Sequence, residues 1–354
     1  MVTDIERAWH AAALRGLLYL ACPSAGTSAI TVTAEAITQR AEETPQEAVP
    51  EAQRLMHPPQ TPPHPPYLDG ADLDGAHLPG AVLHGAILSR ARLRRANLTD
   101  ADLRGTNLTA ASLNEADLTR ANLNEAKLDG AYMGGVILTH ARLHGANLAR
   151  AHLRDADLAG TDLTYTDLGR ADLIDVNLAG AHLTHANLEG AIMDRAHLTG
   201  ADLRDADLRG ADLTRADLTD ARLDGGILDG AILARANLTD ANLDDARLTG
   251  AYLTKANLTR ANLRAAYMTN ADLTCADLTN ADLTDADLTD ARLDDAHLEH
   301  AVGMQVPPGA TWNRETQWPA ALASTVLEQS DEVSPGAFRV HGGSTPDRSD
   351  TVLV

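Results

Sequence analysis

Aromatic side chains are scarce in this sequence of 354 residues, and their scarcity excludes an ordinary globular core. Aromatic residues make up 3% of the chain, and phenylalanine occurs once, at Phe338. Irregular cores rely on large rings to fill their space, so we expect a regular interior instead. The hydrophobic residues, 44% of the chain, are mainly Ala and Leu, which suit a narrow and evenly packed core.

Positive charge is the second shortage. The chain has 50 Asp and Glu against 29 Lys and Arg, so its formal net charge is −21. Direct binding to nucleic acid needs clustered Lys and Arg that displace counterions, so we do not expect it. The acidic balance favours solubility and permits a basic partner.

Cysteine and long apolar runs are also lacking. Cys22 and Cys275 show neither the spacing of a disulfide framework nor that of zinc ligands, so we expect a reducing, cytoplasmic compartment. No run of 18 apolar residues occurs, so we expect no membrane-spanning helix. The stretch 9–22 is weighed as an export signal, but acidic residues precede it and Arg15 interrupts it. A soluble helix is therefore the favoured interpretation, with export as the alternative.

A five-residue repeat fills the middle of the chain. From Ala71 to His300 the sequence divides into 46 pentapeptides without insertion or deletion. The third residue is Leu in 43 of them and Met in three, the first is Ala in 40, and the second is Asp or Asn in 25. The other first residues are all small: Thr106, Val136, Thr161, Thr166, Val176 and Gly226.

This period fits neither a helix nor a flat strand. On a helix, a step of five residues advances about 500°, so the leucines would spiral around the axis. On a flat strand, an odd step moves successive leucines to opposite faces. The chain must therefore turn once in every pentapeptide. The first and third residues point inward, and the polar residues lie outside or in the turn.

The repeat A-[D/N]-L-x-x, as in Ala201–Asp205 and Ala236–Asp240, resembles the pentapeptide-repeat family over about 230 residues. The resemblance implies an all-β solenoid, a right-handed quadrilateral β-helix in which four pentapeptides form one coil. The chain would then form about eleven and a half coils, stacked at the strand spacing of roughly 4.8 Å. Some members of this family resemble duplex DNA and bind DNA gyrase, conferring fluoroquinolone resistance.

The segments before the repeat differ from it in composition. Residues 1–56 are rich in Ala and Glu and predict a small helical or irregular segment. Residues 57–66 predict a Pro-rich linker. Residues 67–70 already hold the repeat register, so the predicted β-helix spans residues 67–301.

Beyond the repeat the pattern breaks at prolines and glycine. Residues 302–343 predict a C-terminal cap region. Trp312 and Trp318 are its candidate capping residues, because large rings would cover the open end of the core and protect its edge. Residues 344–354 predict a disordered tail.

Residues twenty apart share a face if each coil holds twenty residues. The face that starts at Ala71 is nearly balanced in charge and points large apolar side chains outward, so we interpret it as a candidate surface for a partner or a second copy. Its candidate residues are Tyr132, Ile174, Ile192, Ile232 and Tyr252. The faces that start at Ala76 and Ala81 are net acidic. Their candidate residues are Asp202, Asp205, Asp217, Asp220, Asp240, Asp244, Asp245, Asp282 and Asp285.

We predict no catalytic, cofactor-binding or metal-binding residue. The inward positions hold Ala and Leu, and the outward Asp residues are equivalent to one another rather than paired. Two His-x-x-His pairs, His182 with His185 and His297 with His300, lack a cysteine or an evident third ligand.

The favoured function is a non-enzymatic scaffold, bacterial in character, that presents the faces of a rigid rod to a protein partner or to a second copy. One alternative is a DNA-mimicking binder of DNA gyrase or another topoisomerase. It is weakened because the two acidic faces carry −11, against about 32 phosphate charges on a duplex of that length. The remote alternative is an enzyme with activity in the flanks, where no nucleophile–base or metal set is recognisable.

Overall fold

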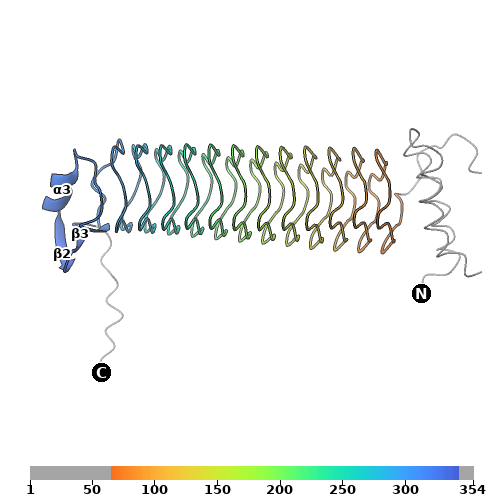
Figure 1. Ribbon diagram of the computed structural model, residues 1–354, viewed down its shortest axis with the longest axis horizontal. Helices are drawn as coiled ribbons and strands as arrows, with labels where there is room; N and C mark the ends of the chain where they lie inside the picture. Colours follow the sequence, from red (N-terminus) through yellow and green to blue (C-terminus); the bar gives the residue numbers. More distant parts are fainter. Residues whose placement is uncertain (1–64, 343–354) are drawn as a thin grey trace, which may run out of the picture. The chain divides into compact units, whose positions relative to one another are not determined.

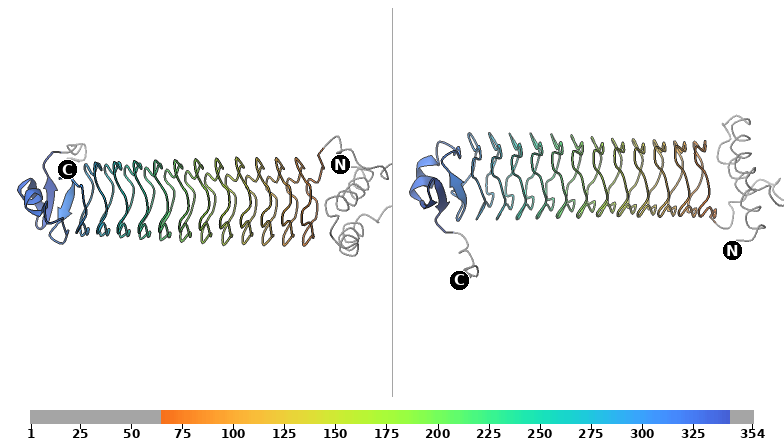
Figure 2. Two further views of the ribbon diagram at one scale, coloured as in Figure 1. Left: turned by 90° about the horizontal axis from the view of Figure 1, so that it is seen from above. Right: turned by 60° about the horizontal axis from the view of Figure 1, so that its bottom comes forward.

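The computed structural model describes residues 65–342, which form two compact units divided between Ala186 and Asn187. In each unit, successive coils lie side by side (Figures 1 and 2). The second residue of one pentapeptide forms a parallel β-bridge with the second residue twenty positions later, as in Asp72↔Arg92 and Ile232↔Tyr252. Four pentapeptides therefore make one coil, and the fold is the predicted right-handed quadrilateral β-helix.

Within each unit, backbone hydrogen bonds join one coil to the next. The N–H of Leu73 donates to the carbonyl of Arg92 at 2.7 Å, and the N–H of Arg92 donates to the carbonyl of Ala71 at 2.8 Å. Within the coil, the N–H of Ala76 donates to the carbonyl of Leu73 at 3.0 Å and closes the turn. Because the same pattern recurs in each pentapeptide, four of its five N–H groups and four of its five carbonyls have a backbone partner.

Each turn depends on its second and fifth residues. All 47 fifth residues from Gly70 to His300 have φ between 51° and 69°, and 31 of them are not glycine. The side chain at the second position supports the turn from outside. The Oδ1 atom of Asn97 accepts the backbone N–H of Thr99 at 3.0 Å and its hydroxyl at 2.7 Å. This local bonding explains why Asp or Asn at the second position is often followed by Thr at the fourth.

The core consists of the first and third residues. Ala and Leu at these positions are almost fully buried in both units, and Met133, Met193 and Met268 lie in the leucine column with no exposed surface. Three buried threonines replace Ala, and each hydroxyl donates to a leucine carbonyl of the preceding coil at 2.9–3.1 Å. These pairs are Thr106 with Leu83, Thr161 with Leu138, and Thr166 with Leu143.

A small sheet follows the last coils of the second unit. Its elements are β1 (Thr311–Asn313), α3 (Ala323–Glu328), β2 (Ser330–Ser334) and β3 (Ala337–Val340). The strands are antiparallel in the order β1-β3-β2, and β1 also continues the coils through the bridge Arg292↔Thr311. No helix within residues 65–342 is long and apolar enough to cross a membrane.

The predicted domain boundaries stay predictions. The parallel bridges run from Tyr67 to His182 in the first unit and from Asn187 to Val302 in the second, where two further bridges reach Thr311 and Gln317. The helical segment predicted for residues 1–56 and the tail predicted for residues 344–354 lie outside the described residues.

Candidate interaction surface

The apolar face is the side of the second unit formed by the pentapeptides that start at Ala191, Ala211, Ala231 and Ala251. Three of its second residues are large and exposed: Ile192 at 42%, Ile232 at 37% and Tyr252 at 53%. The bridge Ile232↔Tyr252 makes these two side chains cross-strand neighbours, whereas Asp212 lies between Ile192 and Ile232. Cross-strand neighbours on one face contact each other and pack together, so the face holds a contiguous apolar pair.

The other two predicted contact residues belong to the first unit. Tyr132 is 50% exposed and stacks on His152, with ring centroids 5.0 Å apart and planes 7° apart. Ile174 is half-buried. The structure therefore gathers three of the five predicted residues on one face of the second unit and places the other two in the first unit.

All nine predicted acidic residues lie in the second unit, and several are neutralised there. Asp202 accepts a hydrogen bond from Nε–H of Arg204 at 2.7 Å, and Asp240 accepts one from Nε–H of Arg260 at 2.7 Å. These hydrogen bonds lower the pKa of both carboxyl groups. Asp282 has a lowered pKa because the hydroxyl of Thr284 donates to it at 2.6 Å, with a contribution from Arg264.

Asp217 is held differently, because no arginine pairs with it. Burial raises the pKa of Asp217, but hydrogen bonds donated by Thr219, Thr199 and Asn237 lower it by a larger amount, so the net shift is downward. The Thr219 hydroxyl donates at 2.6 Å and the Asn237 amide at 3.2 Å. The remaining predicted acids occupy turn positions: Asp205, Asp220, Asp244, Asp245 and Asp285.

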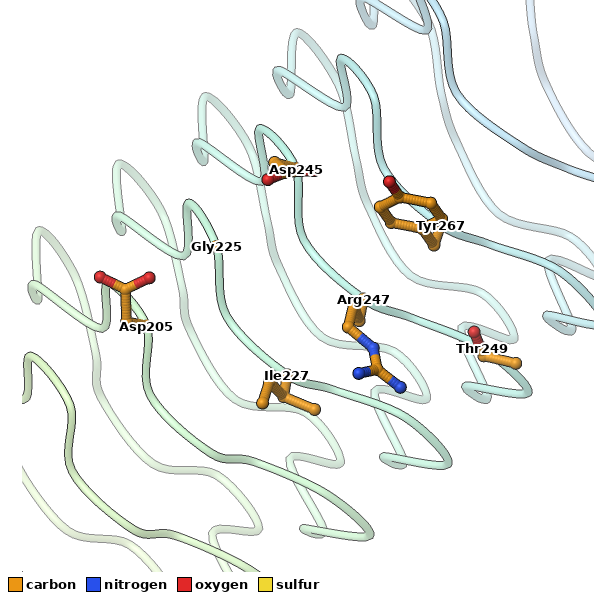
Figure 3. Close-up of a pocket in the computed structure, with 7 residues that line it drawn as sticks. All are labelled: Asp205, Gly225, Ile227, Asp245, Arg247, Thr249 and Tyr267. Carbon is orange, nitrogen blue, oxygen red and sulfur yellow. The ribbon is translucent and has the colours of Figure 1, made fainter.

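A shallow hollow of about 590 Å³ lies on one corner of the second unit, and we name it the acidic hollow (Figure 3). Its lining residues are Asp205, Gly225, Ile227, Asp245, Arg247, Thr249 and Tyr267. The bare Gly225 separates the two carboxylates, and a Cβ at that position would lie 2.6 Å from Oδ1 of Asp205. The hollow therefore exists because a glycine lies between two aspartates in the same corner of consecutive coils.

The two tryptophans continue the leucine column. Ala310 and Thr316 are buried in the place of first residues, and the Thr316 hydroxyl donates to the Leu293 carbonyl at 2.7 Å. Trp312 and Trp318, two residues after them, occupy third positions. Their rings meet edge to face at 5.8 Å. The predicted capping role stays a prediction, now with a defined position for each ring.

Trp312 is also fixed from the side of the small sheet. Its ring stacks on Phe338 of β3 at 4.5 Å, and its Nε1–H donates to the Ser330 hydroxyl of β2 at 3.0 Å. The ring is 6% exposed. It thus joins the last coil to β2 and β3.

One aromatic cluster was missed by the sequence analysis. Tyr165 of the first unit is 60% exposed, stacks on His185 at 4.8 Å and meets the edge of His144 at 5.6 Å. The twenty-residue separation of Tyr165 and His185 was the available signal. Among residues 65–342 no group of three or more His, Cys, Asp or Glu could hold a metal ion.

Comparison with known families gives one match. A family model described as "Pentapeptide repeats" matches eight segments of the chain. They are residues 67–105, 101–139, 141–180, 171–210, 216–254, 231–270, 246–285 and 281–303. A comparison with curated protein sequences found no match.

Several solved structures are similar to parts of the chain. HetL, a pentapeptide repeat protein involved in heterocyst differentiation regulation in the cyanobacterium Nostoc sp. strain PCC 7120, is 38% identical. The match covers 58% of this chain and 88% of HetL, with a TM-score of 0.35. Rfr23, from the cyanobacterium Cyanothece 51142, is 35% identical over 32% of this chain and 60% of its own, with a TM-score of 0.19.

QnrB1, a plasmid-mediated fluoroquinolone resistance protein, is 15% identical. The match covers 60% of this chain and 91% of QnrB1, with a TM-score of 0.39. Because all three TM-scores are below 0.5, these structures support no inference about a partner.

Proposed function

Because the chain belongs to the pentapeptide-repeat family, we propose that it is a non-enzymatic scaffold that presents the rigid faces of its β-helix to a protein partner. The observation that carries the proposal is the apolar face, where Ile192, Ile232 and Tyr252 project from stacked coils. Exposed tyrosine and aliphatic side chains on a fixed backbone bind with little loss of conformational entropy. A partner with a matching apolar patch is therefore the expected ligand.

The absence of catalysis is part of the same proposal. The interior of the coils is filled by Ala and Leu, so no acid or base is held in a desolvated cleft, where catalytic groups usually acquire their shifted pKa values. The predicted cytoplasmic location also stays a prediction. An untargeted metabolite screen that found turnover by the full chain would contradict the non-enzymatic role.

The apolar face predicts a specific loss of binding. Replacing Ile232→Asp together with Tyr252→Asp places two charges in the apolar pair, while Asp remains a common and turn-supporting residue at this position. Quantitative affinity capture from host lysate should show a partner whose recovery falls by about tenfold or more. The measurement is mass spectrometry of wild type and variant, with matched folding checked by circular dichroism.

A control with the same added charge is available on the next face. Asn237→Asp with Asn257→Asp changes the second residues of the following pentapeptides in the same two coils. This variant should retain the partner. If all three proteins recover the same set, the apolar face does not bind and the proposal fails in this form.

Binding to gyrase stays a prediction of the sequence with weaker support. Arginine partners neutralise Asp202, Asp240 and Asp282, so these residues imitate phosphates less well than their number indicates. A gyrase supercoiling assay decides the matter. Inhibition or protection at micromolar concentrations of the protein would favour the DNA mimic over the scaffold.

A further inference from the structure

Four basic residues follow one corner of the second unit in consecutive coils, and we name them the cation row: Arg195, Arg215, Arg235 and Lys255. All four are exposed fifth residues with φ between 58° and 61°. Their backbones are stacked directly, since each N–H donates to the fourth residue of the next coil at 2.9–3.0 Å. At the usual strand spacing of about 4.8 Å, the row places four positive charges within roughly 15 Å.

The row is unfavourable for an isolated molecule. Two like charges about 5 Å apart repel by about 1 kcal/mol in water, and like charges on neighbouring strands are destabilising. Arg195 pairs with Asp194. Across the described part of the chain, no ion pair within 4.0 Å joins Arg215, Arg235 or Lys255 to an acid. Arg215, Arg235 and Lys255 therefore offer positive charge that no acid within 4.0 Å compensates among the described residues, on a chain whose formal net charge is −21.

The acidic hollow lies at the corner two positions further round the same coils, diagonally opposite the row. Its carboxylates, Asp205 and Asp245, are also fifth residues, two coils apart (Figure 3). Ile227, Arg247 and Tyr267 line the adjacent side, where Arg247 is paired with Asp229 at 2.6 Å and Tyr267 is 50% exposed. Carboxylates beside an aliphatic side chain and an aromatic ring suit a guanidinium group on an apolar stem.

The charges of the row and those of the hollow recur with the same spacing along the coils. Arg195 and Arg235, or Arg215 and Lys255, are two coils apart, as Asp205 and Asp245 are. The cation between them would then face Gly225, which has no side chain. A partner without stacked β-strands would lose register along such a row, because its charges would not recur at the strand spacing of about 4.8 Å. The surface that matches without adjustment is built from the same coils.

We propose that the cation row of one copy docks against the acidic hollow of a second copy, so that two β-helices associate side by side. The contact is heterologous, because the row of each copy meets the hollow of the next, and it leaves one row and one hollow available for further copies. The net charge opposes association at long range, so the contact is weak and depends on close ion pairs. The row consists of the fifth residues of the pentapeptides that form the apolar face, so this docking would cover an edge of that face. The row and hollow variants leave Ile232 and Tyr252 unchanged, so the two proposals are tested separately.

The test is sedimentation velocity of the full chain from about 1 µM to about 1 mM, the range in which weak contacts form. The wild type should show a mass that rises with concentration. Reversing the row with Arg195→Glu, Arg215→Glu, Arg235→Glu and Lys255→Glu, or the hollow with Asp205→Lys and Asp245→Lys, should weaken association by about tenfold or more. Glu115, Glu125 and Lys255 occupy the same turn position in the native chain, so both variants are expected to fold.

Mixing the two variants is the decisive experiment. The row-reversed copy has an acidic row, and the hollow-reversed copy has a basic hollow, so their mixture should associate although neither does so alone. As a control, Asp220→Lys with Asp240→Lys makes the same charge change as the hollow reversal at another corner and should associate like the wild type. A wild type that is monomeric up to about 1 mM, association that survives both reversals, or no recovery on mixing would each overturn the docking.

Discussion

At the scale of the residue, the fifth position of the repeat is the most unusual feature of the chain. Left-handed backbone is unfavourable for an L-residue by roughly 1–2 kcal/mol, yet 31 non-glycine residues adopt it here. The hydrogen bonds to both neighbouring coils fix this conformation so firmly that the local preference is overruled. Many of these fifth residues are charged, so this position contributes much of the charge at the corners of the coils.

The strain at this position predicts a stabilising substitution. Ala110 has a φ of 53° and no buried role, so Ala110→Gly should relieve strain and raise the free energy of unfolding by up to about 1 kcal/mol. Ala111, its neighbour, has no exposed surface. Ala111→Gly should lower the free energy by about 1–2 kcal/mol, because it removes a packed methyl group and frees the unfolded chain. Denaturant unfolding of both variants measures the difference, and a shift in the same direction would contradict this account.

At the scale of the element, each coil is stabilised chiefly by its two neighbours, so the last coil is the weak point of a stack. We expect the C-terminal sheet to protect this end through Trp312, whose ring contacts both Trp318 and Phe338.

Removing the central ring should therefore loosen the end of the second unit. Trp312→Ala deletes a side chain that is 6% exposed and should destabilise the cap by about 3–5 kcal/mol. Hydrogen exchange should accelerate first in β1 to β3 and in the coils next to them. Arg314→Ala, in the same segment but with a side chain 70% exposed, is the control and should change little. Uniform acceleration along the unit would argue against fraying from the end.

At the scale of the whole molecule, ion pairs between coils offset part of the acidic balance. Arg120 pairs with Asp100 at 2.7 Å, and Arg95 pairs with Glu115 at 2.8 Å, each between the same positions of adjacent coils. Their side chains are well exposed, so each pair contributes little by itself. Their number makes the stability of the molecule depend on the ionised state of its carboxylates.

This dependence predicts acid lability. Hydrogen bonds from Arg94 and Arg92 lower the pKa of Asp74 from 3.8 to about 2, although burial opposes them. Arg104 and Arg209 likewise lower the pKa of their neighbouring carboxylates. Because these pKa values lie below those of the unfolded chain, the stabilisation is complete above about pH 4 and is lost as the pH falls towards 2.

Thermal unfolding measured between pH 7 and pH 2 should show this loss, and NMR titration should find Asp74 still ionised at pH 3. The substitution Asp74→Asn removes one contributor and should flatten the pH dependence slightly. Asp294 works in the opposite direction, because burial raises its pKa. An unfolding temperature that stays constant down to pH 2 would disprove the account.

The five-residue period alone determined one turn in every pentapeptide, the inward leucines and the polar turns, whereas the coil of four pentapeptides was implied by the family resemblance. This was possible because the signal is local and repeated. Ala201, Leu203 and Asp205 already define one side of the coil, and all the remaining pentapeptides have the same pattern. The burial of Met193 and Met268 followed from the same rule. No long-range information was needed, because each coil contacts copies of itself.

Only the tertiary structure decided which side chains meet across coils. The cation row escaped the sequence analysis because charges were summed over whole faces, where acids such as Asp194 and Asp272 cancel it. The pairing of Asp240 with Arg260 depends on side-chain geometry that composition does not contain. Trp312 and Trp318 lie beyond the break in the repeat, so counting by fives cannot place them, and the chain returns to the leucine column only because the stacked coils below supply its hydrogen bonds.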